Sequence, residues 1–141
     1  MFKKLLSINT SSIQLDLASL VLRLIGGGFM LTHGWPKLQK VLGGDFGFAD
    51  PIGLGASTSL VLTVAAEFGG ALMLVFGFAT RLISIPLMFT MVVAAFVVHG
   101  SDPFGKQEFP LLYFVIYLAL FFLGSGKFSV DALFRNNKSS L

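Results

Sequence analysis

The sequence predicts an all-α integral membrane protein, built as an antiparallel bundle of four transmembrane helices in one domain over residues 1–141, with a long extracytoplasmic loop between the first two helices. Three observations predict this fold. Hydrophobic residues make up 55% of the chain and charged residues only 12%, where a soluble domain has about 25% charged residues. The mean hydropathy is +0.84. Four apolar stretches approach the length of about 20 residues that crosses a bilayer.

The first two stretches cover residues 17–35 and 59–78. Asp16 is a suitable N-cap for the first helix, and Pro36 is expected to end it. The second stretch carries one formal charge, Glu67, near its middle. A carboxylate at that depth costs on the order of 3 kcal/mol, so we expect it to have a partner, a proton or a wet cavity.

The last two stretches cover residues 81–99 and 109–123. Pro86 predicts a kink in the third helix, which neighbouring helices can accommodate. Pro110 fits the first turn of the fourth helix. This helix is short, so Glu108 and Gly124 are expected at its two membrane interfaces.

The connections between these helices differ in length. Ala79 and Thr80 form so short a link that the second and third helices must be antiparallel neighbours. The link over residues 37–58 is long and contains several large apolar side chains, so we expect it to fold back over the outer mouth of the bundle. Glycines within the helices predict close backbone contacts, and Gly27, Met30 and Gly34 share one helical face with Arg23.

An even number of spans puts both termini on one side of the membrane. Lysine and arginine favour the cytoplasmic side, which predicts cytoplasmic termini in a plasma (inner) membrane protein. Residues 1–16 lack the apolar core and cleavage site of a signal peptide, and an interfacial or unstructured lead-in is expected there. The terminal side holds Lys3, Lys4, Arg81, Lys127, Arg135 and Lys138, and the opposite side holds Lys37, Lys40 and Lys106.

Two classes of function are excluded by composition. The chain has no cysteine, which excludes thiol–disulfide exchange and cysteine-held zinc or iron–sulfur sites. The ten basic residues are spread along the chain without forming a stripe, so no nucleic-acid partner is expected.

The intramembrane charges predict a polar site. Arg23 and Glu67 are expected to differ in depth by about 7 Å, which an arginine side chain can span. An Arg23–Glu67 pair would keep the carboxylate ionised. Alternatively, Arg23 reaches back to the headgroups and Glu67 stays protonated. A structural ion pair and a ligand or proton site are both open readings of these charges.

Further titratable groups are expected at the outer ends of the helices. His33, Lys37, His99 and Glu108 share a similar depth, and together they can surround a polar headgroup. The alternative is that each is an ordinary interfacial residue. Their spacing matches no metal site, and no intrinsic cofactor is predicted. Tyr113 and Tyr117 lie on one face of the fourth helix, where they either line a cavity or form hydrogen bonds across helices.

The ordered motifs RLIGGGFMLTHGWPKL, AAEFGGALMLVFGFATR and GSGKFSVD, with a histidine closing the third helix, resemble the DoxX/DoxD-like membrane proteins. The resemblance covers roughly residues 16–134. The residues of the family's motifs correspond to these positions of the chain: Arg23, His33, Gly34, Lys37, Glu67, Gly70, Gly77, Arg81, Gly124, Gly126, Ser129 and Asp131.

The resemblance implies a four-helix bundle and a link to membrane redox chemistry through quinones, with a redox partner subunit. The first hypothesis is therefore an accessory subunit that binds a quinone or membrane lipid around Glu67. A non-enzymatic scaffold or assembly factor, dimeric through a glycine-lined face, is the alternative. A transporter of a small solute is a third hypothesis, since intramembrane charges also mark transport pathways.

Overall fold

The computed structural model describes residues 11–138, with side chains described for residues 11–135. These residues form helices and connections without a strand. Four helices are long and apolar enough to cross a membrane: Ser12–Leu42, Ala56–Phe76, Thr80–Val98 and Phe104–Leu123. The predicted all-α membrane fold is confirmed. The lead-in expected at the N-terminus falls largely on residues 1–10, outside the described residues.

The first helix, α2 (Ser12–Leu42), is longer than predicted at both ends. Its N-cap is Ser11, whose backbone N–H donates to the side chain of Gln14 at 2.8 Å, so the prediction of Asp16 as N-cap is wrong. Pro36 lies inside the helix rather than at its end. Proline removes one backbone hydrogen bond, a loss that packed transmembrane helices tolerate. Lys37 therefore projects from a helix rather than from a loop.

The second span contains a π-helical segment. It consists of α3 (Ala56–Val64), the π-helical η1 (Ala65–Gly70) and α4 (Ala71–Phe76). The extra residue in such a segment changes which side chains share a face, and π segments are frequent at functional sites. Glu67 lies within η1 and is 5% exposed.

The third and fourth spans form a helical hairpin. The third consists of α5 (Thr80–Val93) and a second π-helical segment, η2 (Ala94–Val98). The fourth, α6 (Phe104–Leu123), begins five residues before the predicted start. Glu108 is therefore in the second turn of α6, not just before its first residue as predicted. A short helix that was not predicted, α7 (Val130–Lys138), follows.

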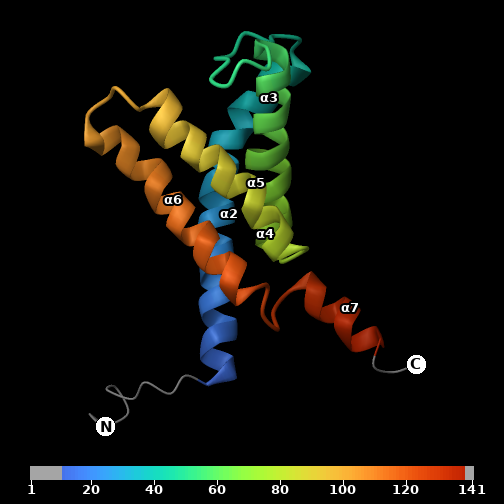
Figure 1. Ribbon diagram of the computed structural model, residues 1–141. Coiled ribbons are helices and arrows are strands. Elements are labelled where there is room, and N and C mark those ends of the chain that lie inside the picture. Colours follow the sequence, from blue (N-terminus) through green and yellow to red (C-terminus); the bar gives the residue numbers. More distant parts are fainter. Residues whose placement is uncertain (1–10, 139–141) are drawn as a thin grey trace.

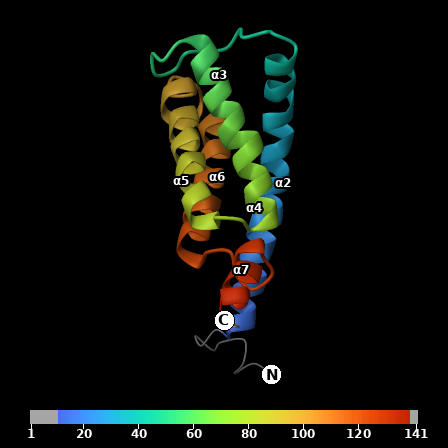
Figure 2. The same ribbon diagram turned by 90° about the vertical axis from the view of Figure 1, so that its right-hand side faces the viewer.

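The four spans alternate in direction. In Figures 1 and 2, α2 runs beside α3–η1–α4, and α5 runs beside α6. We call the end that carries the connections 43–55 and 99–103 the loop end. The opposite end, with residues 77–79 and 124–129, is the turn end. Toward the loop end, the α5–α6 pair diverges from α2 and α3 (Figure 1).

The connection 43–55 lies beyond the end of α3 (Figure 1). Pro51, Ile52 and Leu54 from this connection join α3 and α5 in lining an apolar groove of about 220 Å³. The connection thus packs on α3 and α5, and it contributes no lining residue to the polar cavity described below. Asp50 holds it on α3 by accepting hydrogen bonds from the backbone of Gly55 and the hydroxyl of Ser59.

Close contact between α2 and the second span requires glycine. A Cβ added at Gly34 would lie 2.7 Å from the carbonyl of Glu67, and one added at Gly27 would lie 2.9 Å from the carbonyl oxygen of Ala71. Gly27 and Gly34 are two helical turns apart on the face that they were predicted to share with Arg23 and Met30. All four residues are buried. The two backbones therefore touch within η1, at Glu67, and at the first residue of α4, Ala71.

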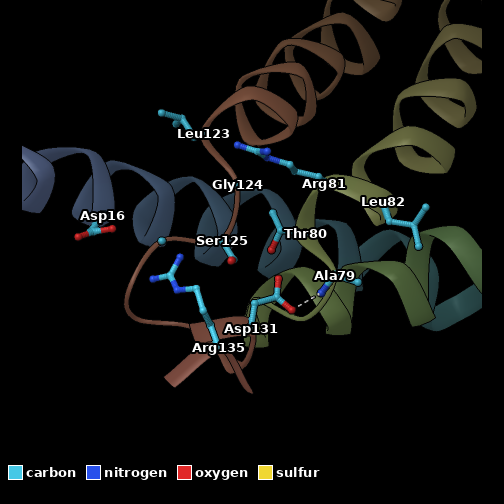
Figure 3. Close-up of a pocket in the computed structure, with 11 residues that line it drawn as sticks. Asp16, Ala79, Thr80, Arg81, Leu82, Leu123, Gly124, Ser125, Asp131 and Arg135 are labelled. Atoms are coloured by element: carbon cyan, nitrogen blue, oxygen red, sulfur yellow. Dashed lines mark hydrogen bonds between the residues drawn. The ribbon is translucent and has the colours of Figure 1, made fainter. Parts of the chain in front are cut away.

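Long-range hydrogen bonds join the tail segment (residues 124–129) to α2 at the turn end. The hydroxyl of Ser19 donates to the carbonyl of Gly124 at 2.6 Å. Asp131 accepts a hydrogen bond from the backbone of Ala79 at 2.9 Å (Figure 3) and donates its own backbone N–H to Gly77. These contacts fix the tail segment against α2 and the start of α7 against the turn between α4 and α5.

Arg23 belongs to this turn-end network. Its guanidinium is fully buried and donates to the carbonyl of Phe128, and it lies against Gly77 and Ser129. The predicted ion pair between Arg23 and Glu67 is therefore wrong, as is the alternative that Arg23 reaches back to the headgroups. The tail segment folds back onto α2, and its carbonyl supplies the partner for the arginine.

Candidate functional site

A polar cavity of about 240 Å³ opens among α2, η1, α5, η2 and α6 at the loop end. We call it the loop-end cavity. Five of its lining residues are apolar: Met30, Met91, Ala94, Phe109 and Pro110. The other six carry polar or ionisable groups: His33, Lys37, Glu67, His99, Lys106 and Tyr113. Such a mixture of apolar walls and a few converging polar groups is typical of small-molecule sites.

An ion pair between Lys37 and Glu67 forms one wall of the cavity. The side chain of Glu67 is 7% exposed and that of Lys37 is 26% exposed. Lys37 can reach Glu67 because α2 continues past Pro36 and because Gly34, one turn earlier, lets the two helices touch. The partner expected for Glu67 therefore exists, but it is Lys37 rather than Arg23.

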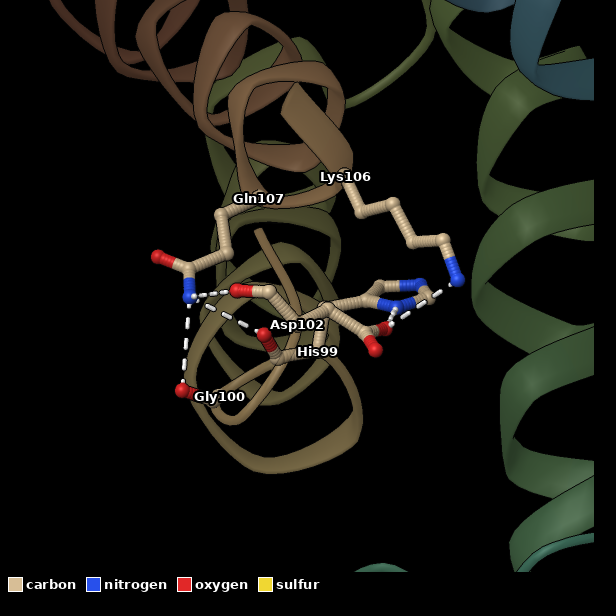
Figure 4. A network of polar contacts seen from close by, with 5 residues as sticks. All are labelled: His99, Gly100, Asp102, Lys106 and Gln107. Atoms are coloured by element: carbon tan, nitrogen blue, oxygen red, sulfur yellow. Dashed lines mark hydrogen bonds and ion pairs between the residues drawn. The ribbon is translucent and has the colours of Figure 1, made fainter. Parts of the chain in front are cut away.

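A second polar cluster comes from the connection between α5 and α6. Nδ1 of His99 lies 2.8 Å from a carboxylate oxygen of Asp102, and the ammonium of Lys106 lies 3.6 Å from the same oxygen. Gln107 donates to the carbonyl of His99 at 3.0 Å and so anchors the turn. Figure 4 shows the ring of His99 and the ammonium of Lys106 directed toward the span that carries Glu67.

The electrostatics of this cluster depend on Asp102. The hydrogen bond with His99, aided by the nearby charge of Lys106, holds the pKa of the Asp102 carboxyl below its ordinary value of 3.8. Asp102 is therefore ionised throughout the physiological range. It orients the imidazole at the cavity wall, as a carboxylate partner commonly does for histidine.

Aromatic rings line the floor of the cavity. The ring of His33 meets that of Tyr113 edge-on at 6.1 Å, and Tyr113 stacks on Tyr117 at 6.0 Å. The hydroxyl of Tyr117 donates to the carbonyl of Gly26 at 3.1 Å, so the predicted cross-helix bond is confirmed for this tyrosine. The hydroxyl of Tyr113 makes no hydrogen bond with another residue in the described part of the chain.

The structure brings together most of the residues expected at the site. Five line the loop-end cavity: His33, Lys37, Glu67, His99 and Tyr113. Three do not: Arg23 is at the turn end, Tyr117 is buried beneath the cavity, and Glu108 is exposed on α6. Glu108 points away because it lies five residues before Tyr113 within α6, which places it about 140° around the helix from that cavity-lining residue.

Lys106 is the functional candidate that the sequence analysis missed. Its spacing of four residues from Asp102 was the available signal, but the sequence analysis used Lys106 only in the count of charges on the side opposite the termini. Among residues 11–135, no group of three or more metal-ligating side chains is placed to hold a metal ion.

Comparison of the sequence with known proteins relates this chain to one family. The DoxX family profile matches residues 18–100. The candidate oxidoreductase CatD of Bacillus subtilis (strain 168) is 30% identical over 126 residues, which cover 88% of this chain and 92% of the relative. The inner membrane protein YqjF of Escherichia coli (strain K12) is 27% identical over 122 residues, covering 84% and 92%. No solved structure matches the chain.

Proposed function

Because the chain belongs to the DoxX family of membrane proteins, we propose that it is an accessory subunit of a membrane redox assembly and binds a quinone or lipid headgroup in the loop-end cavity. The observation that carries this proposal is the Lys37–Glu67 ion pair in the wall of a cavity that His99 and Tyr113 also line. The oxidoreductase name of the relative CatD supports a redox setting.

The donor set fits the headgroup of a quinone. A bound quinone supplies two carbonyl acceptors and takes up two electrons and two protons on reduction. The ammonium of Lys37 and the hydroxyl of Tyr113 are donors for the carbonyl oxygens, and Met30 and Phe109 are apolar neighbours for the ring. In this proposal the partner subunit supplies the electrons.

Glu67 and His99 are suited to carry protons between this ring and the loop end. Both are titratable groups in the cavity wall, and intramembrane carboxylates and histidines serve as proton relays in membrane proteins. The contact with Lys37 holds the carboxyl group of Glu67 at the wall of the cavity that His99 also lines.

Equilibrium binding of a short-chain quinone to the full-length protein in nanodiscs tests the proposal. Glu67→Gln and Lys37→Met are each expected to weaken binding by about tenfold or more, as loss of a charge-assisted hydrogen bond does. Lys127→Gln, which removes an exposed charge at the turn end, is the matched control. Equal binding by all four proteins would contradict a site in this cavity.

The assembly proposal has its own readout. A redox subunit is expected to copurify with the wild-type chain from native membranes. If Glu67→Gln keeps that partner and the cellular phenotype, whereas Gly34→Leu loses both, the chain is a scaffold. Loss of the phenotype in Glu67→Gln with the partner retained supports a ligand-binding subunit.

We further propose that the loop end faces away from the cytoplasm in the plasma (inner) membrane. In the sequence, the side predicted to hold the termini carries six lysines and arginines against three on the opposite side, and α2 begins at the turn end. The relative YqjF is named as an inner membrane protein. Because the chain lacks cysteine, Ser101→Cys and Lys127→Cys are clean reporters. An impermeant maleimide should label only Ser101→Cys in intact cells, and labelling of Lys127→Cys alone would reverse the orientation.

A further inference from the structure

A second cavity, of about 540 Å³, lies at the turn end. Its lining comes from the start of α2, the start of α5, the tail segment and α7, including Asp16, Thr80, Ser125 and Asp131 (Figure 3). It is separate from the loop-end cavity and shares no lining residue with it. We call it the turn-end cavity.

Two arginines and two aspartates line this cavity. Figure 3 shows Arg81 reaching in from α5 and Arg135 from α7, with Ser125 and Thr80 between them in this view. Arg81 donates one hydrogen bond, to the carbonyl of Phe122 at 3.1 Å. Within the described residues, Arg135 is bound to no partner. Guanidinium groups present paired N–H donors that match the oxygens of a phosphate.

The acidic groups are only partly used by the protein. Asp131 accepts a hydrogen bond from Ala79 through one oxygen, and Asp16 accepts one from the backbone of Lys127 at 3.0 Å through Oδ1. Asp16 Oδ2 and Thr80 Oγ1 are buried and have no hydrogen-bond partner in the described part of the chain; the cation beside Asp16 Oδ2 is the exposed ammonium of Lys127, at 3.8 Å. Unpartnered buried oxygens are rare in folded proteins and call for an explanation such as a ligand.

The cavity lies where the apolar spans end. Helix α4 ends at Phe76, α5 begins at Thr80 and α6 ends at Leu123. Around the charged groups, large apolar side chains are exposed: Leu82, Phe122, Leu133 and Phe134. This combination of charge and exposed apolar surface is that of a membrane interface, where lipid phosphates are the abundant anions.

From these observations we infer that the turn-end cavity binds the headgroup of an amine-bearing zwitterionic phospholipid. Arg81 and Arg135 bind the phosphate ester, and Asp16 and Asp131 bind the ammonium. The balanced charges, two positive and two negative, favour such a headgroup over one that is purely anionic. The site is independent of the proposed quinone-binding function.

Native mass spectrometry of the full-length protein tests this inference, with equal amounts of phosphatidylethanolamine and phosphatidylglycerol added in detergent. The wild type should retain phosphatidylethanolamine, and Arg135→Gln should reduce that adduct by about tenfold. Arg135 is exposed and outside the turn-end hydrogen bonds, so this variant is expected to fold. Lys40→Gln, at the loop end, is the matched control and should bind as the wild type does.

Two further arms sharpen the test. Asp16→Asn should lower retention of phosphatidylethanolamine relative to phosphatidylglycerol, because it removes the charge that faces the ammonium. Inorganic phosphate should not displace the lipid. Equal adducts in Arg135→Gln and Lys40→Gln would overturn the proposal, and so would full displacement by inorganic phosphate, which would identify a soluble ligand instead.

Discussion

At the turn end, buried polar side chains bind backbone groups from distant parts of the chain. At the loop end, charged side chains bind one another around a cavity. Arg23 and Ser19 donate to carbonyls of residues more than a hundred positions later, whereas Lys37 pairs with Glu67 beside His99. Contacts with backbone fix the tertiary structure, while paired charges at a cavity can exchange partners with a ligand. The turn end therefore holds the bundle together, and the loop end carries the site proposed for a quinone.

The largest loss of stability is expected for Gly77→Ala at the turn end. Gly77 has φ +69°, and an added Cβ would lie 1.9 Å from Nη1 of Arg23 and 2.6 Å from Cβ of Ser129. Backbone strain and overpacking together should lower the free energy of unfolding by about 2–5 kcal/mol. Gly44→Ala is the matched control, because Gly44 has φ +75° but nothing within 4 Å. An equal loss of unfolding free energy in both variants would show that backbone strain, rather than overpacking against Arg23 and Ser129, causes the effect.

Gly34→Ala tests the contact that brings Lys37 to Glu67. The added Cβ would lie 2.7 Å from the carbonyl of Glu67, so α2 and η1 must separate. We expect a loss of about 1–3 kcal/mol in the free energy of unfolding, together with weaker quinone binding. Gly28→Ala, with open space at its Cβ, should leave both quantities near their wild-type values. A wild-type result for Gly34→Ala would contradict the close helix contact.

Tyr117→Phe removes a single hydrogen bond beneath the cavity. The bond from its hydroxyl to the carbonyl of Gly26 should contribute about 0.6 kcal/mol, the average for transmembrane hydrogen bonds. Tyr113→Phe is the control for unfolding measurements, since its hydroxyl has no partner among the described residues. The order of the two effects should be reversed for quinone binding, which Tyr113→Phe should weaken more than Tyr117→Phe does.

The smallest effect is expected from acidification of the loop end. The pKa of Asp102 is lower in the folded chain than its ordinary value of 3.8, chiefly through the hydrogen bond with His99. Its contribution to stability is complete above the pKa of the unfolded chain and is lost as the pH falls through the folded pKa. The unfolding midpoint of the wild type should therefore fall more on acidification than that of Asp102→Asn. If the unfolding midpoints of the two proteins fell equally as the pH was lowered, the His99–Asp102 pair would contribute nothing to stability.

Hydropathy was sufficient to predict the four spans and the tight link at Ala79, because both depend on local composition. The end of α2 was predicted wrongly because the rule that proline ends a helix is weaker inside a packed membrane bundle. That one error placed Lys37 in a loop and left Arg23 as the nearest cation for Glu67. The partner of Glu67 also depends on the π-helical turn of η1, for which residues 65–70 give no local signal.

The turn end shows a different limit of sequence analysis. The family motif singled out Gly77, Gly124, Gly126, Ser129 and Asp131, but it gave them no role. Their contacts join residues far apart in the chain, such as the hydrogen bond from Ser19 to Gly124. Long-range contacts of this kind leave no periodicity in a single sequence, so only the three-dimensional structure reveals the turn-end network.

The division between the two ends is tested most directly by the rise in unfolding temperature that a short-chain quinone produces in nanodiscs, compared between the wild type and Glu67→Gln. A ligand at a hundred times its Kd should stabilise the folded wild type by about 2.7 kcal/mol. We predict that Glu67→Gln without ligand unfolds close to the wild type and gains at most about half of that stabilisation at the same quinone concentration, because its binding is about tenfold or more weaker. An equal rise in both proteins would contradict a ligand site at the loop end.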